Sequence, residues 1–495
     1  MNEGSKKIVI VGSGLGGLFS GALLAKNGHQ VTVIEGHYNV GGYASSFKRG
    51  KSVHEVAIHC LDGFSPDSEK IVGFKELEIL DNVTFVRTPE FYVFRIGNKS
   101  LTIPDNTDLA LTALKNYYPE DSEGLEEFFY VIKNVEKEIN NYKDRIKEED
   151  DPFLFLRYPL IGKYKDLSVS EFLESRMSNL ELKLLLMANI QFYHDDPLEL
   201  DFLSYAYGNS YYFNYGQFFI KGSSQSLGDY LRNYITSRNG EFIMGTLANG
   251  VVLEQNAIKA VKTFKRSSEE KAIVQGDIFV FNNPPTEVER WINNKDLLLV
   301  GPFKDKKFSK SACTLYLEFD VPPSSFGHRG YVNYFFFPNN KGKGQLYSGF
   351  GFIDYAQIDS DLNQGGKSIA SIVFMADYED WFELSTEEYT AKKKAIINEL
   401  LGYLDERYPG IRATCSKAEL ATPLTMERYT YNPNGAVYAF SPTSKNALTE
   451  DLIKNNLANA YFASAWVGAP GFSGSSTSGI NTANKIIKKY GSAIK

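Results

Sequence analysis

Three glycines near the start of the chain have the spacing of a phosphate-binding turn. Gly12, Gly14 and Gly17 directly follow the apolar run 7–11, and residues 15–26 then carry apolar side chains at helical spacing. In a strand–turn–helix unit the first glycine permits the tight turn, the second lets a pyrophosphate approach the backbone, and the third lets the helix lie close to the sheet. The free N–H groups and the dipole at the helix N-terminus attract phosphate. The segment therefore predicts a dinucleotide-binding turn.

An acidic residue ends the next predicted strand. Residues 30–34 form a second apolar run, and Glu35 follows it. A carboxylate there accepts hydrogen bonds from the adenosine ribose hydroxyls and disfavours the 2′-phosphate of NADP. The alternative is an ordinary acidic residue at an exposed strand end. Because the strand, turn, helix, second strand and acidic residue come in the expected order, they predict a complete βαβ unit.

Two more glycines indicate which dinucleotide, NAD or FAD, the turn binds. Gly41 and Gly42 lie just after the second strand, and this double glycine is a fingerprint of one FAD-binding superfamily. The segment 35–47 resembles the phytoene desaturase, carotenoid isomerase and retinol saturase group of flavoproteins, and 54–59 partly resembles its Phe-Asp-x-Gly-x-His stretch. The resemblance implies that FAD is the cofactor and that Gly41, Gly42 and Ile58 bind it. Many relatives carry an arginine in place of Tyr43.

Later segments extend the resemblance over almost the whole chain. Residues 421–438 look like the strand and turn found late in these enzymes, and 470–479 look like their C-terminal FAD motif, where the last helix points its N-terminus at the cofactor. Ala248 falls where a strand beside the adenine is expected. Ser464 departs from a common glycine, and 219–223 replaces a Pro-x-Gly-Gly pattern. The cofactor-binding residues that the C-terminal motif implies are Pro470, Gly471, Gly474, Ser478 and Gly479.

The catalytic residue is less clearly marked than the cofactor site. The resemblance places His59 beside the isoalloxazine, and the alternative is a buried, hydrogen-bonded histidine. His54, His194 and His328 lack metal-ligand spacing, and the three cysteines are scattered, so no metal site is expected. Cys60 has no lysine or helix N-terminus beside it, which predicts an inert thiol.

Composition narrows the class of protein and of partner. The chain has 495 residues, and 53 basic against 60 acidic side chains give a net charge of −7. Without a basic excess to release counterions, nucleic acid is not expected as a partner. Three cysteines rule out a disulfide scaffold, and no apolar run is long enough to cross a membrane. We expect a cytoplasmic protein and leave contact with a membrane surface open.

The expected fold class is α/β, with a doubly wound, Rossmann-like FAD-binding domain and a discontinuous α+β substrate domain. The FAD-binding domain is expected from 1–75, 215–300 and 440–495. The substrate domain is expected from 76–214 and 301–439.

Four other local predictions concern secondary structure. A helix is expected from Ser168 to about Ile190, a strand at 273–281 and a terminal helix at 480–490. Eight aromatic side chains between Tyr205 and Phe219 predict either a sheet face packed under helices or the wall of an apolar tunnel.

The resemblance implies an FAD-dependent oxidoreductase acting on C–C or C=C bonds of a long, hydrophobic, polyene-like substrate, as a desaturase, saturase or isomerase. Such a substrate would come from a membrane or a carrier protein. Two alternatives share the N-terminal motifs or the fold. One is a flavin amine oxidase, and the other is a non-enzymatic binding protein of the Rab escort and GDI type.

Overall fold

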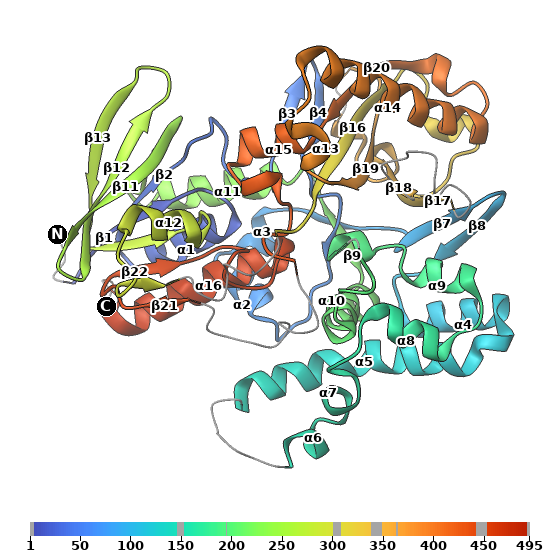
Figure 1. Ribbon diagram of the computed structural model, residues 1–495, viewed down its shortest axis with the longest axis horizontal. Helices are drawn as coiled ribbons and strands as arrows, with labels where there is room; N and C mark the ends of the chain where they lie inside the picture. Colours follow the sequence, from blue (N-terminus) through green and yellow to red (C-terminus); the bar gives the residue numbers. More distant parts are fainter. Residues whose placement is uncertain are drawn as a thin grey trace.

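The computed structural model describes residues 4–145, 153–194, 196–299, 308–337, 349–362, 365–441 and 453–492. Figure 1 shows three parts: a parallel sheet with its helices on the left, a mixed sheet at the upper right, and a block of helices at the lower right. Within the described residues, no helix is long and apolar enough to cross a membrane.

The parallel sheet is assembled from three distant parts of the chain. Its order is β10-β2-β1-β14-β22, and all four pairings are parallel. β1 lies in the centre because its apolar run is covered on both faces, as parallel strands require. The strands are β1 (Lys7–Val11), β2 (Gln30–Ile34), β10 (Glu241–Ile243), β14 (Ile278–Phe281) and β22 (Ala460–Phe462).

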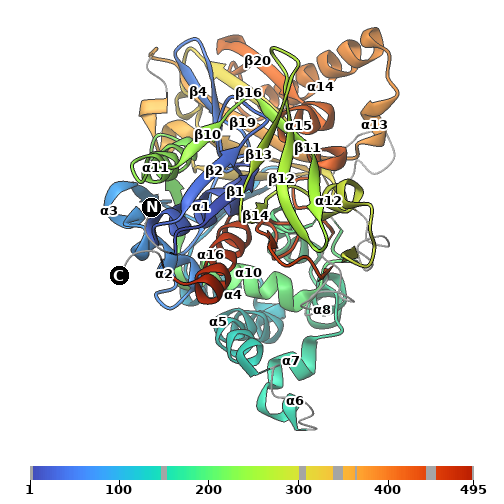
Figure 2. The ribbon, with the colours of Figure 1, turned by 90° about the vertical axis from the view of Figure 1, so that its left-hand side faces the viewer.

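Helices cover one face of this sheet (Figure 2). They are α1 (Leu15–Lys26), α2 (Glu69–Glu76), α3 (Ile79–Asn82), α11 (Gln225–Thr236) and α16 (Gly471–Tyr490). α1 and α16 approach so closely that a Cβ on Gly479 would lie 2.4 Å from the Gly16 carbonyl oxygen. The predicted terminal helix at 480–490 is therefore too short, because α16 already begins at Gly471.

A three-stranded antiparallel sheet and α12 (Pro285–Ile292) cover the other face. The strands are β11 (Thr246–Glu254), β12 (Ala257–Lys265) and β13 (Glu270–Gln275). The single strand predicted at 273–281 is wrong, because β13 and β14 belong to different sheets. The chain changes sheets at Gly276 and Asp277, whose N–H groups donate to Lys259 and Lys7 respectively.

The mixed sheet has the order β20-β16-β19-β18-β17-β7-β8, antiparallel except for β7 beside β17. Its strands are β7 (Tyr92–Ile96), β8 (Lys99–Ile103), β16 (Ser311–Phe319), β17 (Val332–Phe336), β18 (Gly349–Asp354), β19 (Ser368–Ala376) and β20 (Cys415–Ala421). Helices α13 (Glu379–Phe382), α14 (Thr386–Arg407) and α15 (Pro423–Thr430) lie beside it. The strand and turn expected at 421–438 is wrong at its start, where Pro423 opens α15.

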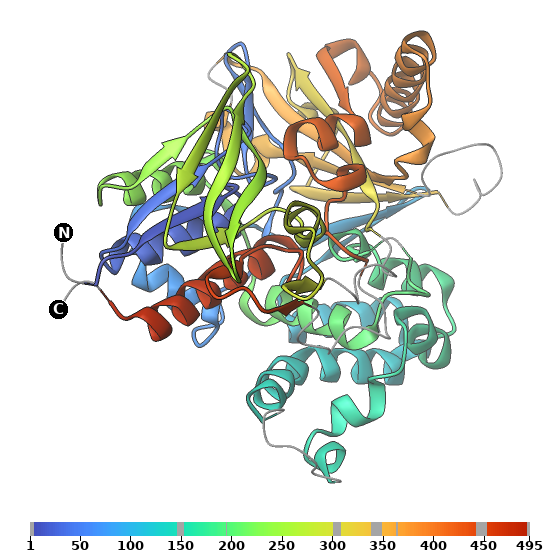
Figure 3. The same cartoon turned by 60° about the vertical axis from the view of Figure 1, so that its left-hand side comes forward.

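The helical block projects below the two sheets (Figure 3). It contains α4 (Thr107–Tyr117), α5 (Ser122–Arg145), α6 (Leu154–Arg157), α7 (Pro159–Tyr164), α8 (Val169–Arg176), α9 (Leu180–Leu186) and α10 (Phe202–Tyr215). The single helix predicted from Ser168 to Ile190 is wrong, because Met177 is extended and Asn179 caps a new helix. The sheet face predicted at 205–219 is also wrong, because most of that segment forms α10.

Short strands connect these parts. They are β3 (Ser46–Arg49) with β4 (Ser52–Glu55), then β5 (Leu61–Asp62) and β6 (Phe85–Arg87) on either side of β9 (Gln217–Ile220), and β15 (Leu298–Leu299) with β21 (Lys454–Asn455). β9 follows α10 directly and pairs with β5 and β6. It therefore joins the helical block to the segment 61–87, which comes after the parallel strand β2 in the chain.

Candidate functional site

A cavity of about 1000 Å³ lies at the carboxyl ends of β1 and β2. This edge is where open α/β sheets bind ligands. The cavity volume is at the upper end of the range for small-molecule sites. The predicted residues that line it are Gly12, Gly14, Glu35, Gly41, Gly42, Ile58, Ala248 and Gly471.

The other predicted cofactor residues shape the cavity walls without lining it. A Cβ on Gly17 would lie 2.1 Å from the Gly12 carbonyl oxygen, and one on Gly474 would lie 1.9 Å from that of Ala469. Gly479 holds α16 against α1, as described above. Ser478 accepts a hydrogen bond from the Ser464 N–H at 3.1 Å, and Pro470 precedes the first residue of α16.

The glycine turn is held by a residue that the sequence analysis missed. Asn282 follows β14, and its Oδ1 accepts the Gly14 N–H at 3.0 Å. Its Nδ2 donates to the Ala463 carbonyl oxygen at 2.5 Å, which ties β22 to the same turn. A polar residue directly after an apolar strand, at the carboxyl edge of a parallel sheet, is the signal that could have identified it.

Glu35 is fixed in place by its neighbours. Its Oε2 accepts from the Ser13 N–H at 2.7 Å and from the Ser13 hydroxyl at 2.6 Å, and its Oε1 accepts from the His37 N–H at 2.7 Å. The carboxylate therefore lies between the glycine turn and the loop after β2. The carboxylate is thus held by three donors and is not free at an exposed strand end, and its contact with a ribose stays a prediction.

Two helices present their N-termini to the cavity. α1 begins after Gly14 and α16 after Pro470, and neither has a side-chain hydrogen bond capping its first turn. Leu15 in the first turn of α1, and Gly471 and Phe472 in the first turn of α16, line the cavity. Uncapped N–H groups and two helix dipoles favour an anion between them.

A buried ion pair supports the start of α16 from behind. The Lys70 ammonium is almost fully buried and lies 3.0 Å from the Asp62 carboxylate. It also donates to the Ser473 hydroxyl at 2.9 Å, and that hydroxyl donates to Asp62. Ser473 belongs to the first turn of α16, so this network fixes where the helix N-terminus points.

His59 lies just beyond the cavity wall formed by Val56, Ala57 and Ile58. Burial lowers the pKa of His59 to about 4, so its imidazole is neutral at pH 7. Its Nδ1 lies 2.6 Å from the hydroxyl of Tyr355, in the 3-10 helix Tyr355–Gln357. Burial holds the pKa of Tyr355 well above its ordinary value of 10, so the phenol keeps its proton and its hydroxyl shares a hydrogen bond with Nδ1.

His59 is surrounded by aromatic side chains. Tyr331 donates to its backbone carbonyl oxygen, and Phe219 packs against both Tyr331 and Tyr355 at ring distances of 6.0 and 5.9 Å. Burial raises the pKa of the neighbouring Cys60 thiol, which keeps it protonated. The imidazole therefore lies in an apolar pocket with one fixed orientation.

The eight aromatic side chains of 205–219 do not line the large cavity. Tyr205, Tyr212, Phe213 and Phe219 are buried in the core that joins the helical block to the mixed sheet. The structure thus brings His59 to the cavity wall and keeps this aromatic stretch behind it.

A buried carboxyl lies behind the same wall. Glu55 ends β4 and accepts hydrogen bonds from the N–H, at 2.9 Å, and the hydroxyl of Ser224, just before α11. Burial outweighs these hydrogen bonds and raises the pKa of Glu55 to about 8. Ser223, in the left-handed region with φ of 88°, donates to Ser46, which lines the cavity.

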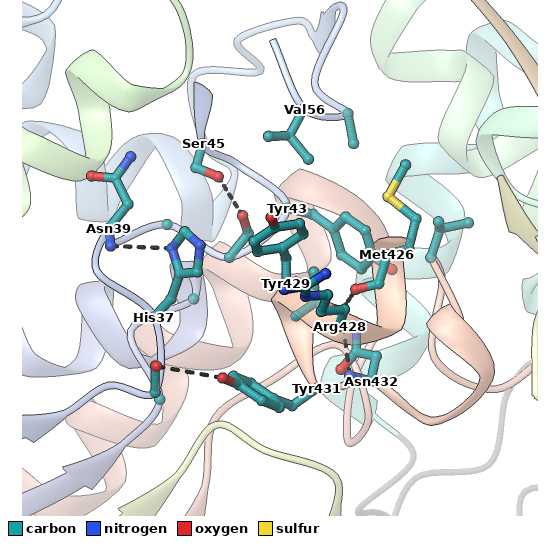
Figure 4. Close-up of a pocket in the computed structure, with 18 of the residues that line it drawn as sticks. His37, Asn39, Tyr43, Ser45, Val56, Met426, Arg428, Tyr429, Tyr431 and Asn432 are labelled. Atoms are coloured by element: carbon teal, nitrogen blue, oxygen red, sulfur yellow. Dashed lines mark hydrogen bonds between the residues drawn. The ribbon is translucent and has the colours of Figure 1, made fainter. Parts of the chain in front are cut away.

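The opposite wall comes from α15 and the loop after it. Figure 4 shows Met426, Arg428 and Tyr429 facing the loop that carries His37 and Tyr43. The Tyr43 hydroxyl donates to the Gly435 carbonyl oxygen at 2.8 Å, so this departure from the usual arginine ties the two walls together.

Comparisons with known proteins agree with this geometry. The family described as an NAD(P)-binding Rossmann-like domain matches residues 10–74. The chloroplastic prolycopene isomerase 1 of an Oncidium hybrid cultivar is 24% identical over 466 residues, which cover 86% of this chain and 74% of that protein. The all-trans-retinol 13,14-reductase of Danio rerio is 22% identical over 485 residues, covering 87% of this chain and 77% of that one.

The chain is a distant homologue of prolycopene isomerases and retinol reductases. The predicted family resemblance is thereby confirmed. The two alignments cover 86% and 87% of the chain.

Solved structures confirm the predicted fold class. An oxidoreductase from Methanosarcina mazei superposes with a TM-score of 0.65 at 16% identity, covering 98% of this chain and all of that one. Putrescine oxidase superposes with a TM-score of 0.60 at 13% identity, covering 98% and 99%. The fold is a parallel Rossmann-like sheet joined to a mixed sheet, and the exact domain boundaries given above stay a prediction.

Proposed function

We propose that this protein is an FAD-dependent oxidoreductase that acts on C–C or C=C bonds of a long, hydrophobic, polyene-like substrate. One observation carries the proposal. The glycine turn, the fixed carboxylate of Glu35 and two uncapped helix N-termini all face one cavity of about 1000 Å³.

The donor set fits FAD. Gly12, Gly14 and the N-terminus of α1 would hold the pyrophosphate, and Glu35 would hold the adenosine ribose. The N-terminus of α16 and residues 56–58 would flank the flavin end. Bound FAD supplies hydride and electron transfer, which is chemistry that side chains cannot supply.

His59 is the proposed proton donor or acceptor at a substrate carbon. Its ring has a fixed direction because Tyr355 and Tyr331 hold the ring and its backbone. A neutral imidazole can polarise or protonate a reacting centre when it is held in a dry pocket. Buried aromatic side chains pack around it, and exclusion of water there would protect reactive species from hydrolysis.

Two observations support a hydrophobic substrate. Prolycopene isomerase and all-trans-retinol 13,14-reductase are named for polyenes, and both align over most of this chain. The cavity also continues beyond the loop after β2 to apolar side chains of the mixed-sheet part, namely Leu384, Leu420, Leu424 and Met426. We propose that such a substrate arrives from a membrane surface or a carrier protein.

A flavin amine oxidase and a GDI-type binding protein are the alternatives. The amine oxidases share the fold at 12–14% identity, and a fold alone does not choose a substrate. The long alignments to polyene enzymes favour a polyene substrate over an amine. The intact glycine turn with Glu35 favours an enzyme that uses its cofactor over a GDI-type binding protein.

The test starts from the purified protein saturated with FAD. It is incubated, in oxidised form and after chemical reduction under anaerobic conditions, with prolycopene, all-trans-retinol, putrescine or cyclohexylamine. Chromatography and mass spectrometry of the polyenes should show isomerisation or a mass change of two hydrogens, and the amines should be unchanged. Oxidation of an amine with no change in either polyene contradicts the proposal, and a protein that binds no flavin contradicts it at an earlier step.

A further inference from the structure

A second cavity of about 240 Å³ adjoins the first beyond Glu35. Residues 36–38, 244–245, 265–267 and 428–429 line it, and we call it the cationic groove. It shares Gly36, His37, Tyr38, Arg428 and Tyr429 with the large cavity, so the two lie next to each other.

The charge of this groove is opposite to that of the protein. Lys265, Arg266 and Arg428 line it, and none of its lining residues is Asp or Glu, although the chain carries a net charge of −7. Within the described residues, no carboxylate forms an ion pair with any of these three cations. Three cations without acidic partners in a concave site attract an anion, and arginine pairs with phosphate through two parallel hydrogen bonds.

Aromatic rings line the same groove and stay open to solvent. Tyr38 is 70% exposed and Tyr429 48% exposed, which is unusual for such large side chains. The His37 ring lies between them, 4.0 Å from the Tyr38 ring and 5.6 Å, edge-on, from that of Tyr429. Figure 4 shows His37 and Tyr429 on facing walls. Exposed rings of this kind are platforms on which a planar base stacks.

His37 also leaves a buried hydrogen-bond donor unused. Its Nδ1 accepts the Asn39 N–H at 3.1 Å, so the hydrogen is on Nε2. Nε2 is buried and has no hydrogen-bond partner among the described residues. Such a group is rare in folded proteins, and it is satisfied when a ligand offers an acceptor.

We propose that the cationic groove is a second nucleotide-binding site, adjoining the cofactor site, that takes a nucleoside phosphate. The phosphates lie against Arg266, Arg428 and Lys265, and the base stacks on Tyr38 or Tyr429. The proposal does not depend on the reaction proposed above, because Lys265 and Arg266 line the groove and not the large cavity.

The test uses the purified protein saturated with FAD and isothermal titration with ADP, adenosine or inorganic phosphate. ADP should bind at least tenfold more tightly than adenosine or inorganic phosphate. Adenosine contacts only the aromatic rings of the groove, and phosphate contacts only its cations. Raising the salt concentration should weaken ADP binding, because the cations are exposed. The flavin released during each titration is measured by absorbance of the filtrate.

Matched variants locate the site. The double variant Lys265→Gln, Arg266→Gln, at two residues that line the groove and not the large cavity, should weaken ADP binding at least tenfold and leave the FAD content unchanged. Lys271→Gln, on β13 of the same hairpin but outside the groove, should change neither.

Four results overturn the proposal. They are no ADP binding at millimolar concentration, ADP binding that releases FAD in equal amounts, phosphate binding as tightly as ADP, and affinities that the double variant does not change. The second would make the groove the outer end of the cofactor site. Whether FAD itself binds is measured independently, by the flavin absorbance spectrum of the protein.

Discussion

The nucleotide end of the large cavity and the surroundings of His59, just beyond the cavity wall, are built by different means. At the nucleotide end, backbone groups do the binding: the turn from Gly12 to Gly17, the N-termini of α1 and α16, and a single carboxylate. Around His59, side chains do the positioning, because Tyr331, Tyr355 and Phe219 hold one imidazole in place. Changes of side chain should therefore act in opposite ways in the two regions.

The two regions differ in how well they tolerate added or removed side-chain atoms. A backbone site has no room for an added atom, since the contacts are already at van der Waals distance before any ligand enters. A side-chain site tolerates the loss of one hydroxyl at the cost of one hydrogen bond, which contributes about 1 kcal/mol. Adding atoms should abolish function in the first region, and removing them should tune it in the second.

The largest effect is expected at Gly14. In Gly14→Val the new Cβ lies 2.5 Å from Asn282 Oδ1, and the branched side chain fills the space where the pyrophosphate approaches. We expect complete loss of bound flavin, measured by absorbance of the purified protein. Gly402→Val is the control, because a Cβ there meets nothing within 4 Å. A Gly14→Val protein that purifies fully yellow places the phosphates elsewhere.

Gly479→Val should come next. A Cβ at this residue meets the Gly16 carbonyl oxygen at 2.4 Å, so α16 must move away from α1. We expect strongly reduced flavin affinity together with a lower Tm, since backbone overlap of this kind costs roughly 1–3 kcal/mol or more. Gly468→Ala is the control in the same part of the chain, because its Cβ makes an ordinary 3.5 Å contact with Ser478. Unchanged flavin affinity in Gly479→Val shows that α16 is not part of the cofactor site.

A smaller effect is expected at Tyr355. Tyr355→Phe removes the hydrogen-bond partner of His59 Nδ1, so the ring is held less firmly. We expect kcat with a polyene substrate to fall by about tenfold while flavin content and Tm stay near those of the unchanged protein. Tyr193→Phe is the control, because the Tyr193 hydroxyl has no hydrogen-bond partner among the described residues. Equal kcat values for the two variants argue against a role of Tyr355 in positioning His59.

At neutral pH the smallest effect is expected at Glu55, which is still protonated there, so this prediction concerns stability at other pH values. Because burial raises the pKa of Glu55 from 4.5 to about 8, the folded state holds this proton more tightly than the unfolded state. The contribution to stability is complete below pH 4.5 and is lost as pH rises through 8. Glu55→Gln cannot ionise, so it should be more stable than the unchanged protein at pH 9, by on the order of a few kcal/mol, and not at pH 5. Tm measured at both pH values decides this, with Glu270→Gln on exposed β13 as the control.

The nucleotide end could be predicted from the sequence because its signal is local. Gly12, Gly14 and Gly17 lie within six residues, and each glycine has one steric reason to be there. Asn282 was missed because its contact with Gly14 joins residues 268 apart in the chain. Long-range pairs of this kind leave no spacing to detect.

The surroundings of His59 show the same limit more strongly. His59 itself came from a resemblance, and its partners Tyr331 and Tyr355 lie 272 and 296 residues away. The aromatic stretch 205–219 was mistaken for a sheet face because aromatic side chains favour strands, whereas Asp201 caps a helix there by accepting the Ser204 N–H at 2.6 Å. Local capping and tertiary packing outweighed the intrinsic preference.

The contact between Gly16 and Gly479 also has a consequence for synthesis of the chain. Translation proceeds at about 5–20 residues per second, so roughly 20 to 90 seconds separate the emergence of α1 from that of α16. During this interval the apolar face of α1 that α16 covers in the folded protein is without that cover. The contact between α1 and α16 therefore forms only after the ribosome has translated residues 471–490.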